Sequence, residues 1–319
     1  MKLVILDGYS LNPGDLSWEG FRKFGEVEIY DKTNKEDLSS RIGDAQAIFV
    51  GSSKITSEII DKSENLRYIG TLSTGYNGVD VEYANRKGVI VCNVPTYGTR
   101  AVAQHAIALL LEITNSVASQ HMQVCRGEWS KKGYWSFIKY PMIELENKIM
   151  GIIGYGRIGK STGAIAQALG MKVLANKRTP GDEEETRNFK YASVDEIYEK
   201  SDVIVLHCPL NKDNYHMINK DSISKMKDGV IIINNSRGRL IKEEDLIEGL
   251  KDGKIYAVGL DVTEREPIDD EHELLKTDRV FITPHSSWAP LETRQRLLDI
   301  AVENFEKFIQ GMPQNVVVK

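Results

Sequence analysis

The chain has 319 residues, of which 41% are hydrophobic and 27% are charged, and its formal net charge is -5. This length allows two domains that each bury a core, and the composition is ordinary for a globular protein. The negative charge argues against nucleic acid and anionic membrane surfaces as partners. No apolar run reaches the length of a bilayer span, and the apolar start is too short and turns polar too soon for a secretory signal.

The cysteines and histidines exclude two further kinds of site. Cys92, Cys125 and Cys208 are far apart, odd in number and surrounded by apolar residues, which predicts buried thiols without disulfides. We therefore expect a reducing, cytoplasmic compartment. The six histidines show no metal-site spacing, so no metal is expected. His207 ends a strand and is expected to be a hydrogen-bonded core residue.

The first 98 residues alternate short apolar runs, rich in β-branched residues, with helical stretches such as Lys54–Lys62 and Asp80–Lys87. This alternation predicts parallel βαβ units in a doubly wound sheet. The expected strands are Lys2–Leu6, Val27–Ile29, Ala47–Val50, Tyr68–Thr71 and Val89–Cys92.

One long helix is expected from Val102 to Arg126, with apolar residues on more than one face. A helix with this pattern is too hydrophobic for a solvated surface. It either packs within one subunit or forms part of a subunit interface, and we favour the interface.

A second alternating series follows, and its uninterrupted apolar strands suit a parallel sheet covered on both faces. Ser193, three residues before Glu196, predicts a helix start, and the last helix is expected from Leu291 to Gln310, before Gly311. The expected strands are Lys148–Ile153, Lys172–Ala175, Val203–Leu206, Val230–Ile233, Ala257–Leu260 and Val280–Ile282.

A glycine pattern, Gly154-x-Gly156-x-x-Gly159, joins the first strand of this series to a helix. Alone it is a weak signal, since a plain strand-to-helix turn can carry it. In this context Gly154 permits a tight turn, Gly156 lets a pyrophosphate approach backbone N–H groups, and Gly159 allows close helix–strand packing. The helix N-terminus would also attract the phosphates. The sequence therefore predicts a dinucleotide site.

The next strand bears on which dinucleotide binds. NAD sites usually present an acid roughly 20 residues further on, which bonds the ribose hydroxyls. Here the stretch reads Asn176-Lys177-Arg178, and two cations would attract a 2′-phosphate. Alternatively, both cations point to solvent and the pocket tolerates NAD. The expected cofactor is NAD(H) or NADP(H), with NADP(H) slightly favoured by Lys177 and Arg178.

Three polar residues suit the reduction of a 2-oxo acid. Arg237, just past a strand, would hold the carboxylate bidentately and polarise the carbonyl, although a surface salt bridge is the alternative. His285 also follows a strand end and can donate a proton in reduction and accept one in oxidation. Glu266, between them in the chain, would orient His285 and keep it protonated.

With these motifs in order, the chain resembles the D-isomer-specific 2-hydroxyacid dehydrogenases over nearly its whole length. The matching landmarks are Ser73-Thr74-Gly75-Tyr76-Asn77, the glycine pattern, His207-Cys208-Pro209-Leu210, Asn235-Ser236-Arg237-Gly238, Gly259-Leu260-Asp261-Val262, Glu266-Pro267 and Thr283-Pro284-His285. Within the family, the segments 93–97, 102–105 and 287–299 are most similar to the glycerate dehydrogenases, also called hydroxypyruvate reductases.

The resemblance implies a role for each matching residue. Arg237 would bind substrate, His285 would be the acid/base and Glu266 would support it. Thr74 and Gly75 would bind the substrate carboxylate through backbone N–H groups, with Trp288 among the substrate-binding residues. One departure concerns the cofactor, because many NAD-using members of the family have an acid where Lys177 stands. From the glycine pattern, the two cations and the resemblance together, the residues expected to bind the cofactor are Gly154, Gly156, Arg157, Ile158, Gly159, Lys177, Arg178, Cys208, Pro209, Asn214, Asn235, Ser236, Arg237 and Asp261.

The resemblance also implies an α/β fold with two doubly wound parallel sheets and a cleft between the domains. A discontinuous, flavodoxin-like substrate-binding domain would comprise 1–98 and 287–319. A Rossmann dinucleotide-binding domain would comprise 99–286, with a dimerisation region at about 102–145 that makes a homodimer.

The implied activity is the reversible NAD(P)H-dependent reduction of hydroxypyruvate, and of glyoxylate, to D-glycerate and glycolate. One alternative is a dehydrogenase for another 2-oxo acid, with Trp135, Tyr140 and Trp288 shaping the pocket. Another is a catalytically silent dinucleotide sensor like the corepressors that share this fold. The partner expected in each enzymatic case is a small 2-oxo or 2-hydroxy acid, with no nucleic acid and no membrane.

Overall fold

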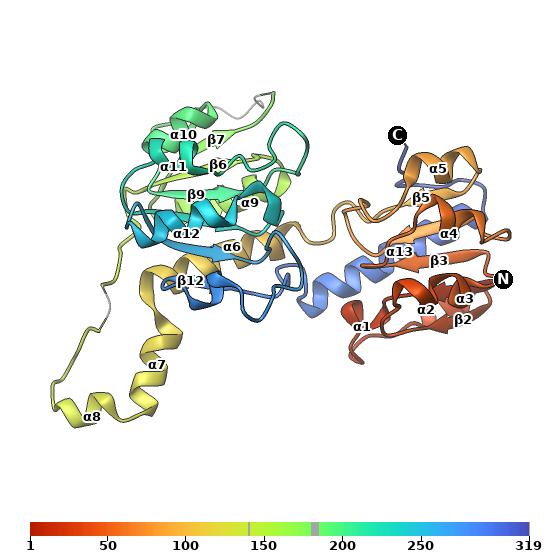
Figure 1. The fold of residues 1–319 in the computed structure, drawn as a ribbon, viewed down its shortest axis with the longest axis horizontal. Coiled ribbons are helices and arrows are strands. Elements are labelled where there is room, and N and C mark those ends of the chain that lie inside the picture. The colour runs from red at the N-terminus through yellow and green to blue at the C-terminus, as the bar shows by residue number, and fades with distance from the viewer. Residues whose placement is uncertain (140, 180–184, 319) are drawn as a thin grey trace. The chain divides into compact units, whose positions relative to one another are not determined.

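The computed structural model describes residues 1–139, 141–179 and 185–318. The chain forms two compact units, one made of Met1–Gly98 with Trp288–Lys319 and the other of Thr99–Ser287 (Figure 1). Each unit contains one parallel sheet, as the alternating strand and helix pattern predicts.

The first unit has a five-stranded sheet in the order β2-β1-β3-β4-β5, which is the flavodoxin-like order. The strands are β1 (Lys2–Ile5), β2 (Glu26–Ile29), β3 (Ala47–Val50), β4 (Tyr68–Thr71) and β5 (Ile90–Cys92). The helices are α1 (Gly8–Leu11), α2 (Glu19–Arg22), α3 (Leu38–Ile42), α4 (Ser57–Asp61), α5 (Val81–Arg86) and α13 (Leu291–Ile309), with a 3-10 turn at Lys35–Asp37.

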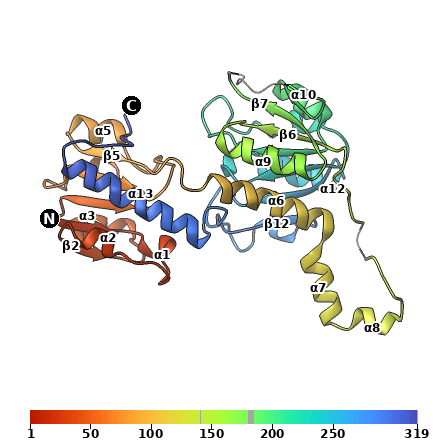
Figure 2. The same ribbon diagram turned by 180° about the vertical axis from the view of Figure 1, so that it is seen from behind.

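Helices cover both faces of this sheet, which is why its central strands are apolar on both sides. On one face, Phe21 of α2 and Phe305 of α13 pack against Phe49 of β3, with ring centroids 4.3 and 5.5 Å apart. Figure 2 shows α13 lying across this face. On the other face, α3, α4 and α5 pack with buried residues such as Ile42 and Ile60. Helix α13, near the end of the chain, thus completes the hydrophobic core formed by the first strands and helices.

The second unit has a seven-stranded sheet in the order β12-β11-β10-β9-β6-β7-β8, a Rossmann order that reverses direction at β6. The strands are β6 (Ile149–Ile153), β7 (Lys172–Asn176), β8 (Phe189–Tyr191), β9 (Val203–Leu206), β10 (Val230–Asn234), β11 (Ile255–Leu260) and β12 (Val280–Ile282). The helices are α6 (Thr99–Asn115), α7 (Val117–Cys125), α8 (Glu128–Lys132), α9 (Arg157–Ala168), α10 (Val194–Lys200), α11 (Lys220–Lys225) and α12 (Glu243–Lys251), with 3-10 turns at Gly238–Leu240 and Glu273–Lys276.

Two helical layers enclose this sheet as well. Helices α6 and α9 contribute to the core on one face, and α10, α11 and α12 to the core on the other. The expected start of α10 is confirmed, because the Ser193 side chain accepts a hydrogen bond from the Glu196 N–H at 3.1 Å.

The expectation of one helix from Val102 to Arg126 is wrong, because the chain breaks at Ser116 into α6 and α7. Ser116 has a left-handed φ of 50°, and the two helices are bent by 54°. The Glu112 carboxylate accepts a hydrogen bond from the Ala118 N–H at 3.2 Å and so stabilises the start of α7. Within the described residues no single helix is long and apolar enough to cross a membrane; only the bent pair α6 and α7 passes that test, by length and composition.

The two helices use their apolar residues differently. Helix α6 packs into the core of its own unit, which agrees with the expectation that this segment is buried within one subunit. Helix α7 leaves Val117, Met122 and Val124 exposed.

Of the three thiols predicted to be buried, Cys92 is buried and Cys208 is half-buried. The prediction is wrong for Cys125, which is exposed at the end of α7 beside His121. Its apolar neighbours belong to a helix that the unit does not cover.

Candidate functional site

The glycine loop between β6 and α9 has the geometry that its sequence predicts. Gly154 has a φ of 101°, and a Cβ on it would lie 2.4 Å from the backbone nitrogen of Cys208. A Cβ on Gly159 would lie 2.5 Å from the Gly154 carbonyl oxygen, so α9 starts directly against the turn. Around Gly156, by contrast, no described residue beyond its two chain neighbours comes within 4 Å of a Cβ, and among the described residues no side chain caps α9 there. The start of α9 therefore offers open space and helix N–H groups, which suit a phosphate.

The end of β7 supports this loop and carries the two cations. The Asn176 carbonyl oxygen accepts hydrogen bonds from the N–H groups of Gly154 (3.1 Å) and Tyr155 (2.8 Å). Lys177 and Arg178 follow and are exposed, as is Arg157 at the start of α9. The two cations thus directly follow Asn176, the residue whose carbonyl oxygen supports the loop.

The segment after β9 is fixed by side-chain hydrogen bonds. Asn214 Nδ2 donates to the Pro209 carbonyl oxygen at 2.8 Å and contacts Cys208 Sγ at 3.7 Å. Ser236 Oγ, from the end of β10, donates to the Cys208 carbonyl oxygen at 2.6 Å. Burial raises the pKa of the Cys208 thiol to about 11, so this cysteine is not a nucleophile near neutral pH.

His207, immediately before this segment, is hydrogen-bonded as expected, but it is half-buried and does not lie fully in the core. Its Nε2 lies 2.8 Å from the hydroxyl of Thr162 on α9, a residue with no exposed surface. Burial lowers the pKa of His207 to about 3, because the surroundings disfavour the charged imidazolium. The ring is therefore neutral and unsuited to acid–base work near neutral pH.

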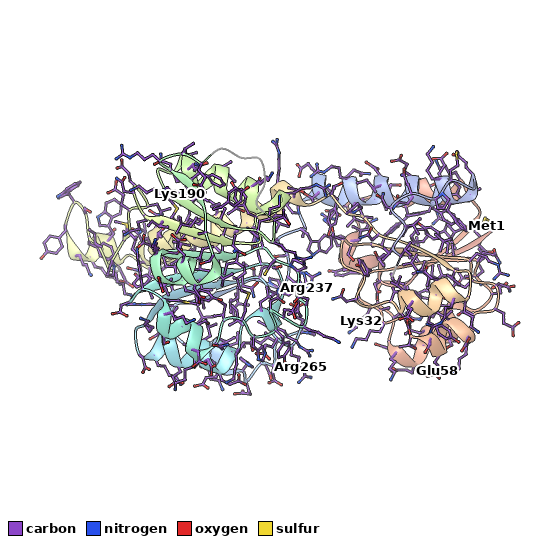
Figure 3. The ribbon with its side chains drawn as sticks, turned by 90° about the horizontal axis from the view of Figure 1, so that it is seen from above. Met1, Lys32, Glu58, Lys190, Arg237 and Arg265 are labelled. Carbon is purple, nitrogen blue, oxygen red and sulfur yellow. The ribbon has the colours of Figure 1, made fainter. Side chains whose placement is uncertain are left out.

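The segment after β10 holds Arg237, which is labelled in Figure 3. Asn234 Nδ2 donates to the Arg237 carbonyl oxygen at 2.8 Å, and Asn235 Nδ2 donates to the Val102 carbonyl oxygen at 2.8 Å. Arg237 is half-buried, donates from its guanidinium to the Ser236 carbonyl oxygen at 2.7 Å, and forms no ion pair with another described residue. The alternative of a surface salt bridge therefore lacks a described partner.

The expected pair of Glu266 and His285 is formed. Glu266 Oε2 lies 2.7 Å from His285 Nδ1, while Glu266 Oε1 accepts a hydrogen bond from the Thr263 N–H at 3.3 Å. Both side chains of the pair are partly exposed, at 44% for His285 and 40% for Glu266. An imidazole held in this way can exchange protons with a ligand while its other nitrogen is bonded to the carboxylate.

Asp261 is predicted to bind the cofactor, but its carboxylate is buried and accepts hydrogen bonds from other residues of the protein. It is 1% exposed and accepts hydrogen bonds from the Thr283 hydroxyl (2.6 Å) and from the N–H groups of Ser286 (2.8 Å) and Ser287 (2.9 Å). His105 of α6 joins this network, with Nε2 2.9 Å from Thr283 Oγ1. Sequence reasoning missed the parts of His105 and Thr283, although both stand in segments that carry the family resemblance.

The remaining predicted residues belong to the first unit. Thr74 Oγ1, after β4, donates to the Val94 carbonyl oxygen at 2.8 Å, and the Thr74 carbonyl accepts from Asn93 Nδ2 at 2.8 Å. Gly75 follows this fixed residue at the carboxyl edge of the sheet. Trp288 packs edge-on against Tyr97 with ring centroids 6.4 Å apart. On the second unit, Trp135 is 92% exposed, and Tyr140 lies outside the described residues.

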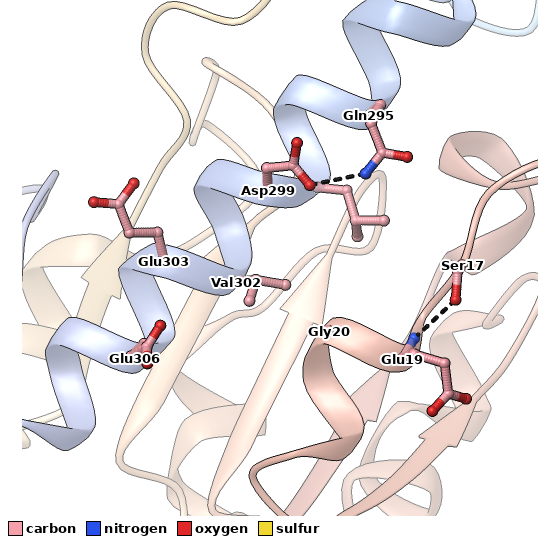
Figure 4. A pocket seen from close by; sticks show the side chains of 9 residues that line it. Ser17, Glu19, Gly20, Gln295, Asp299, Val302, Glu303 and Glu306 are labelled. Atoms are coloured by element: carbon pink, nitrogen blue, oxygen red, sulfur yellow. Dashed lines mark hydrogen bonds between the residues drawn. The ribbon is translucent and has the colours of Figure 1, made fainter.

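Two cavities lie within single units. One of about 430 Å³ in the first unit is formed by α2 and α13 and is lined by acidic side chains including Glu19, Asp299 and Glu303 (Figure 4). Another, of about 380 Å³, is lined by Trp129, Trp135 and their neighbours. Neither contains a predicted catalytic residue. The described part of the chain also holds no cluster of three or more His, Cys, Asp or Glu side chains that could bind a metal ion.

Comparisons with known proteins agree with this geometry. Residues 107–287 match the model of the family "D-isomer specific 2-hydroxyacid dehydrogenase, NAD binding domain". The chain is 52% identical to a hydroxypyruvate reductase of Blautia hydrogenotrophica, and the match covers 100% of both chains.

Two solved structures with bound dinucleotides are also similar. A D-lactate dehydrogenase from Aquifex aeolicus, complexed with NAD and lactic acid, is 29% identical, with a TM-score of 0.84 and coverage of 98% of this chain and 96% of that one. An acyclic imino acid reductase in complex with NADPH and D-Arg is 28% identical, with a TM-score of 0.85 and coverage of 100% of both.

Proposed function

The chain belongs to the D-isomer specific 2-hydroxyacid dehydrogenases, and we propose that it reduces hydroxypyruvate to D-glycerate, and glyoxylate to glycolate. The observation that carries the chemistry is the Glu266–His285 pair, at 2.7 Å, in the unit that also contains the open glycine loop. The choice of hydroxypyruvate rests on the full-length similarity to a reductase of that substrate.

In this proposal each residue acts on one part of the substrate. The Arg237 guanidinium binds the carboxylate and polarises the carbonyl oxygen, and the N–H groups of Thr74 and Gly75 bind the carboxylate as well. Trp288 contributes to the substrate site. The bound dinucleotide supplies the hydride. His285, oriented through Nδ1 by Glu266, donates the proton that the new alkoxide needs and takes it back in the oxidation direction.

The two units divide this work. We assign substrate binding to the first unit, 1–98 with 288–319, and dinucleotide binding to the second unit, 99–287, which contains the family match at 107–287. The boundary expected from the sequence lies one residue earlier, before Ser287. The glycine loop binds the pyrophosphate, because its open start of α9 suits an anion. The other cofactor-binding residues are Arg157, Ile158, Lys177, Arg178, Cys208, Pro209, Asn214, Asn235, Ser236, Arg237 and Asp261. Of these, Asp261 acts through the segment that its carboxylate holds.

For the cofactor we propose a slight preference for NADP(H) over NAD(H). Lys177 and Arg178 are exposed at the end of β7, where a 2′-phosphate would add charge-assisted hydrogen bonds. Exchange of both cations for serine is therefore expected to raise the KM for NADPH and leave the KM for NADH nearly unchanged. An equal effect on both cofactors would contradict a 2′-phosphate site.

We also propose a homodimer built on the region of about 102–145. Helix α7 exposes Val117, Met122 and Val124, and α8 exposes Trp129, an apolar surface that a monomer rarely leaves open. Exchange of Val124 for Glu should yield monomers in light scattering, whereas a wild-type chain that is already monomeric would refute this assembly. The thiols of Cys92, Cys125 and Cys208 are free, which supports a reducing, cytoplasmic location.

The experiment that tests the activity measures initial rates with hydroxypyruvate, glyoxylate, pyruvate and a branched 2-oxo acid, each with NADH and NADPH. We expect hydroxypyruvate to give the highest kcat/KM. His285→Ala should lower kcat by about 10²- to 10⁴-fold while dinucleotide binding stays intact. A preference for the branched acid would assign another dehydrogenase activity. Saturable dinucleotide binding without turnover of any 2-oxo acid would instead identify a sensor.

A further inference from the structure

The segment from Thr283 to Ser287 holds the acid–base histidine in an unusual backbone conformation. His285 has a φ of 51°, in the left-handed region that residues other than glycine seldom adopt. The residues on both sides keep it there: the His285 N–H bonds to the Thr283 carbonyl oxygen at 2.9 Å, and the next two N–H groups bond to Asp261. The position of the imidazole therefore depends on Asp261.

Asp261 in turn needs a partner for its charge. Its carboxylate is buried, and three hydrogen bonds come from neutral donors, the Thr283 hydroxyl and two backbone N–H groups. A buried charge is costly unless polar or cationic groups compensate it. Within the described part of the chain, the ionisable partner of Asp261 is His105, whose Nε2 lies 3.6 Å from Oδ1.

The hydrogen bonds define where the protons lie. The Thr283 hydroxyl donates its single proton to Asp261 Oδ1 at 2.6 Å. Its oxygen can then only accept from His105 Nε2, which lies 2.9 Å away. His105 Nε2 therefore carries a proton, and the order of donation runs from His105 through Thr283 to Asp261.

The packing of α6 on β11 explains how His105 reaches this network. A Cβ on Gly259 of β11 would lie 3.0 Å from Leu109 Cβ, so the helix approaches the strand where the side chain is missing. His105 lies one helical turn before Leu109, and Asp261 lies two residues after Gly259. The close approach thus brings the imidazole of His105 to the end of the strand.

We propose that His105 is a positioning residue for His285: through Thr283 it fixes the Asp261 carboxylate, which holds Ser286 and Ser287 and thereby the imidazole that faces Glu266. The role of His285 in this inference rests on the proposed function. His105 itself touches neither substrate nor dinucleotide in this scheme. Its loss should therefore reduce the chemical step more than binding.

Four variants test the order of donation. His105→Phe keeps a ring without a donor, His105→Gln keeps an N–H donor, and Thr283→Val removes the hydroxyl between the two partners. Thr114→Val is the control, because this buried α6 hydroxyl bonds within its own helix and to its neighbour Asn115. His105→Phe should lower kcat for hydroxypyruvate by about 10- to 100-fold, with the substrate KM and the dinucleotide Kd within about threefold of wild type. His105→Gln should recover most of this loss.

The double variant His105→Phe with Thr283→Val separates a shared role from two independent ones. If both act through Asp261, the double variant should be no slower than the slower single variant. The proposal would be overturned if the kcat losses of the two single variants multiplied in the double variant. It would also be overturned by a His105→Phe enzyme with wild-type kcat, or by a His105→Gln enzyme as slow as His105→Phe.

A readout independent of turnover distinguishes this proposal from the proposed activity. Amide hydrogen exchange of a peptide covering residues 283–288 reports on the Ser286 and Ser287 N–H groups directly. Exchange there should become faster in His105→Phe and Thr283→Val, but not in His105→Gln or Thr114→Val. Unchanged protection in the first two variants would refute the positioning role, whatever substrate the enzyme uses. A wild-type protein that reduces no 2-oxo acid would refute the activity and leave this test standing.

Discussion

Gly238 and Thr263 lie so close together that a Cβ on the glycine would stand 1.8 Å from the threonine's carbonyl oxygen. This contact joins the segment of Arg237 to the segment of Glu266, since each of those residues is within three positions of it. A methyl group would force the two backbones apart. We expect Gly238→Ala to lower the free energy of unfolding by about 1–3 kcal/mol in urea titrations and to reduce kcat as well. A variant with normal stability and activity would show that the contact is dispensable.

Gly156 offers the opposite case, because a methyl group there meets open space. Gly156→Ala should therefore unfold at the wild-type urea concentration. Its methyl group would occupy the approach of the pyrophosphate, so the dinucleotide Kd should rise by 10-fold or more, on the order of 1.4 kcal/mol. Gly154→Ala is the matched comparison and should be destabilised, given its φ of 101° and a contact of 2.4 Å. Fluorescence titration with NADH and NADPH measures the binding, and unchanged affinity in Gly156→Ala would argue against the loop as the phosphate site.

Glu266 should contribute through its charge as well as its position. Glu266→Gln keeps an oxygen that can accept from His285 Nδ1 but cannot compensate a charged imidazolium. The kcat for hydroxypyruvate should fall by about 10- to 100-fold, with the dinucleotide Kd unchanged. Glu244→Gln, an exposed α12 residue, serves as the control and should behave as wild type. An active Glu266→Gln enzyme would assign Glu266 a purely structural role.

His207 makes stability depend on pH in a defined direction. Its pKa is about 3 in the folded state and 6.5 as the reference for the unfolded chain, so between these values the unfolded state binds more protons. Stability therefore falls as pH decreases from about 6.5 toward 3, by at most about 1.4 kcal/mol per pH unit from this group. Urea unfolding at pH 7.5, 6 and 5 should show a smaller decline in His207→Gln than in wild type. A variant of the exposed His121 should keep the wild-type decline.

The strands were the most predictable part of the fold. Val203–Leu206 is buried at every position, and its uninterrupted apolar sequence predicts a strand covered on both faces. Strand β8 escaped prediction because it has three residues, of which only Phe189 is buried. The break at Ser116 escaped because neither glycine nor proline precedes it. Its local signal is weak: Asn115 and Ser116 can bond to nearby backbone in place of continuing a helix.

Some residues of the site can be predicted from their local sequence, whereas others are brought in by contacts between distant parts of the chain. Arg237 and His285 follow strand ends, and their placement is readable from the apolar runs before them. The role of Asp261 cannot be predicted from the local sequence, because its hydrogen-bond donors lie 22 to 26 positions further along the chain. The role of His105 is still harder to predict from the sequence. Its partner Thr283 lies 178 positions further along the chain, and the two meet only because α6 packs on the sheet. Such contacts follow from the tertiary fold and not from any local pattern.

The boundary between the two units follows directly after Ser287, whose N–H is bonded to Asp261. The acid–base histidine, its carboxylate and the glycine loop are therefore all encoded by one uninterrupted stretch, Thr99–Ser287. In the proposed function, the first unit supplies the substrate-binding residues Thr74, Gly75 and Trp288 from the stretches on either side. A chimaera that exchanges these outer stretches for those of a relative would inherit new substrate contacts and keep the reacting groups of this chain. Under the proposed function, substrate range and proton transfer are therefore encoded by different stretches of the gene.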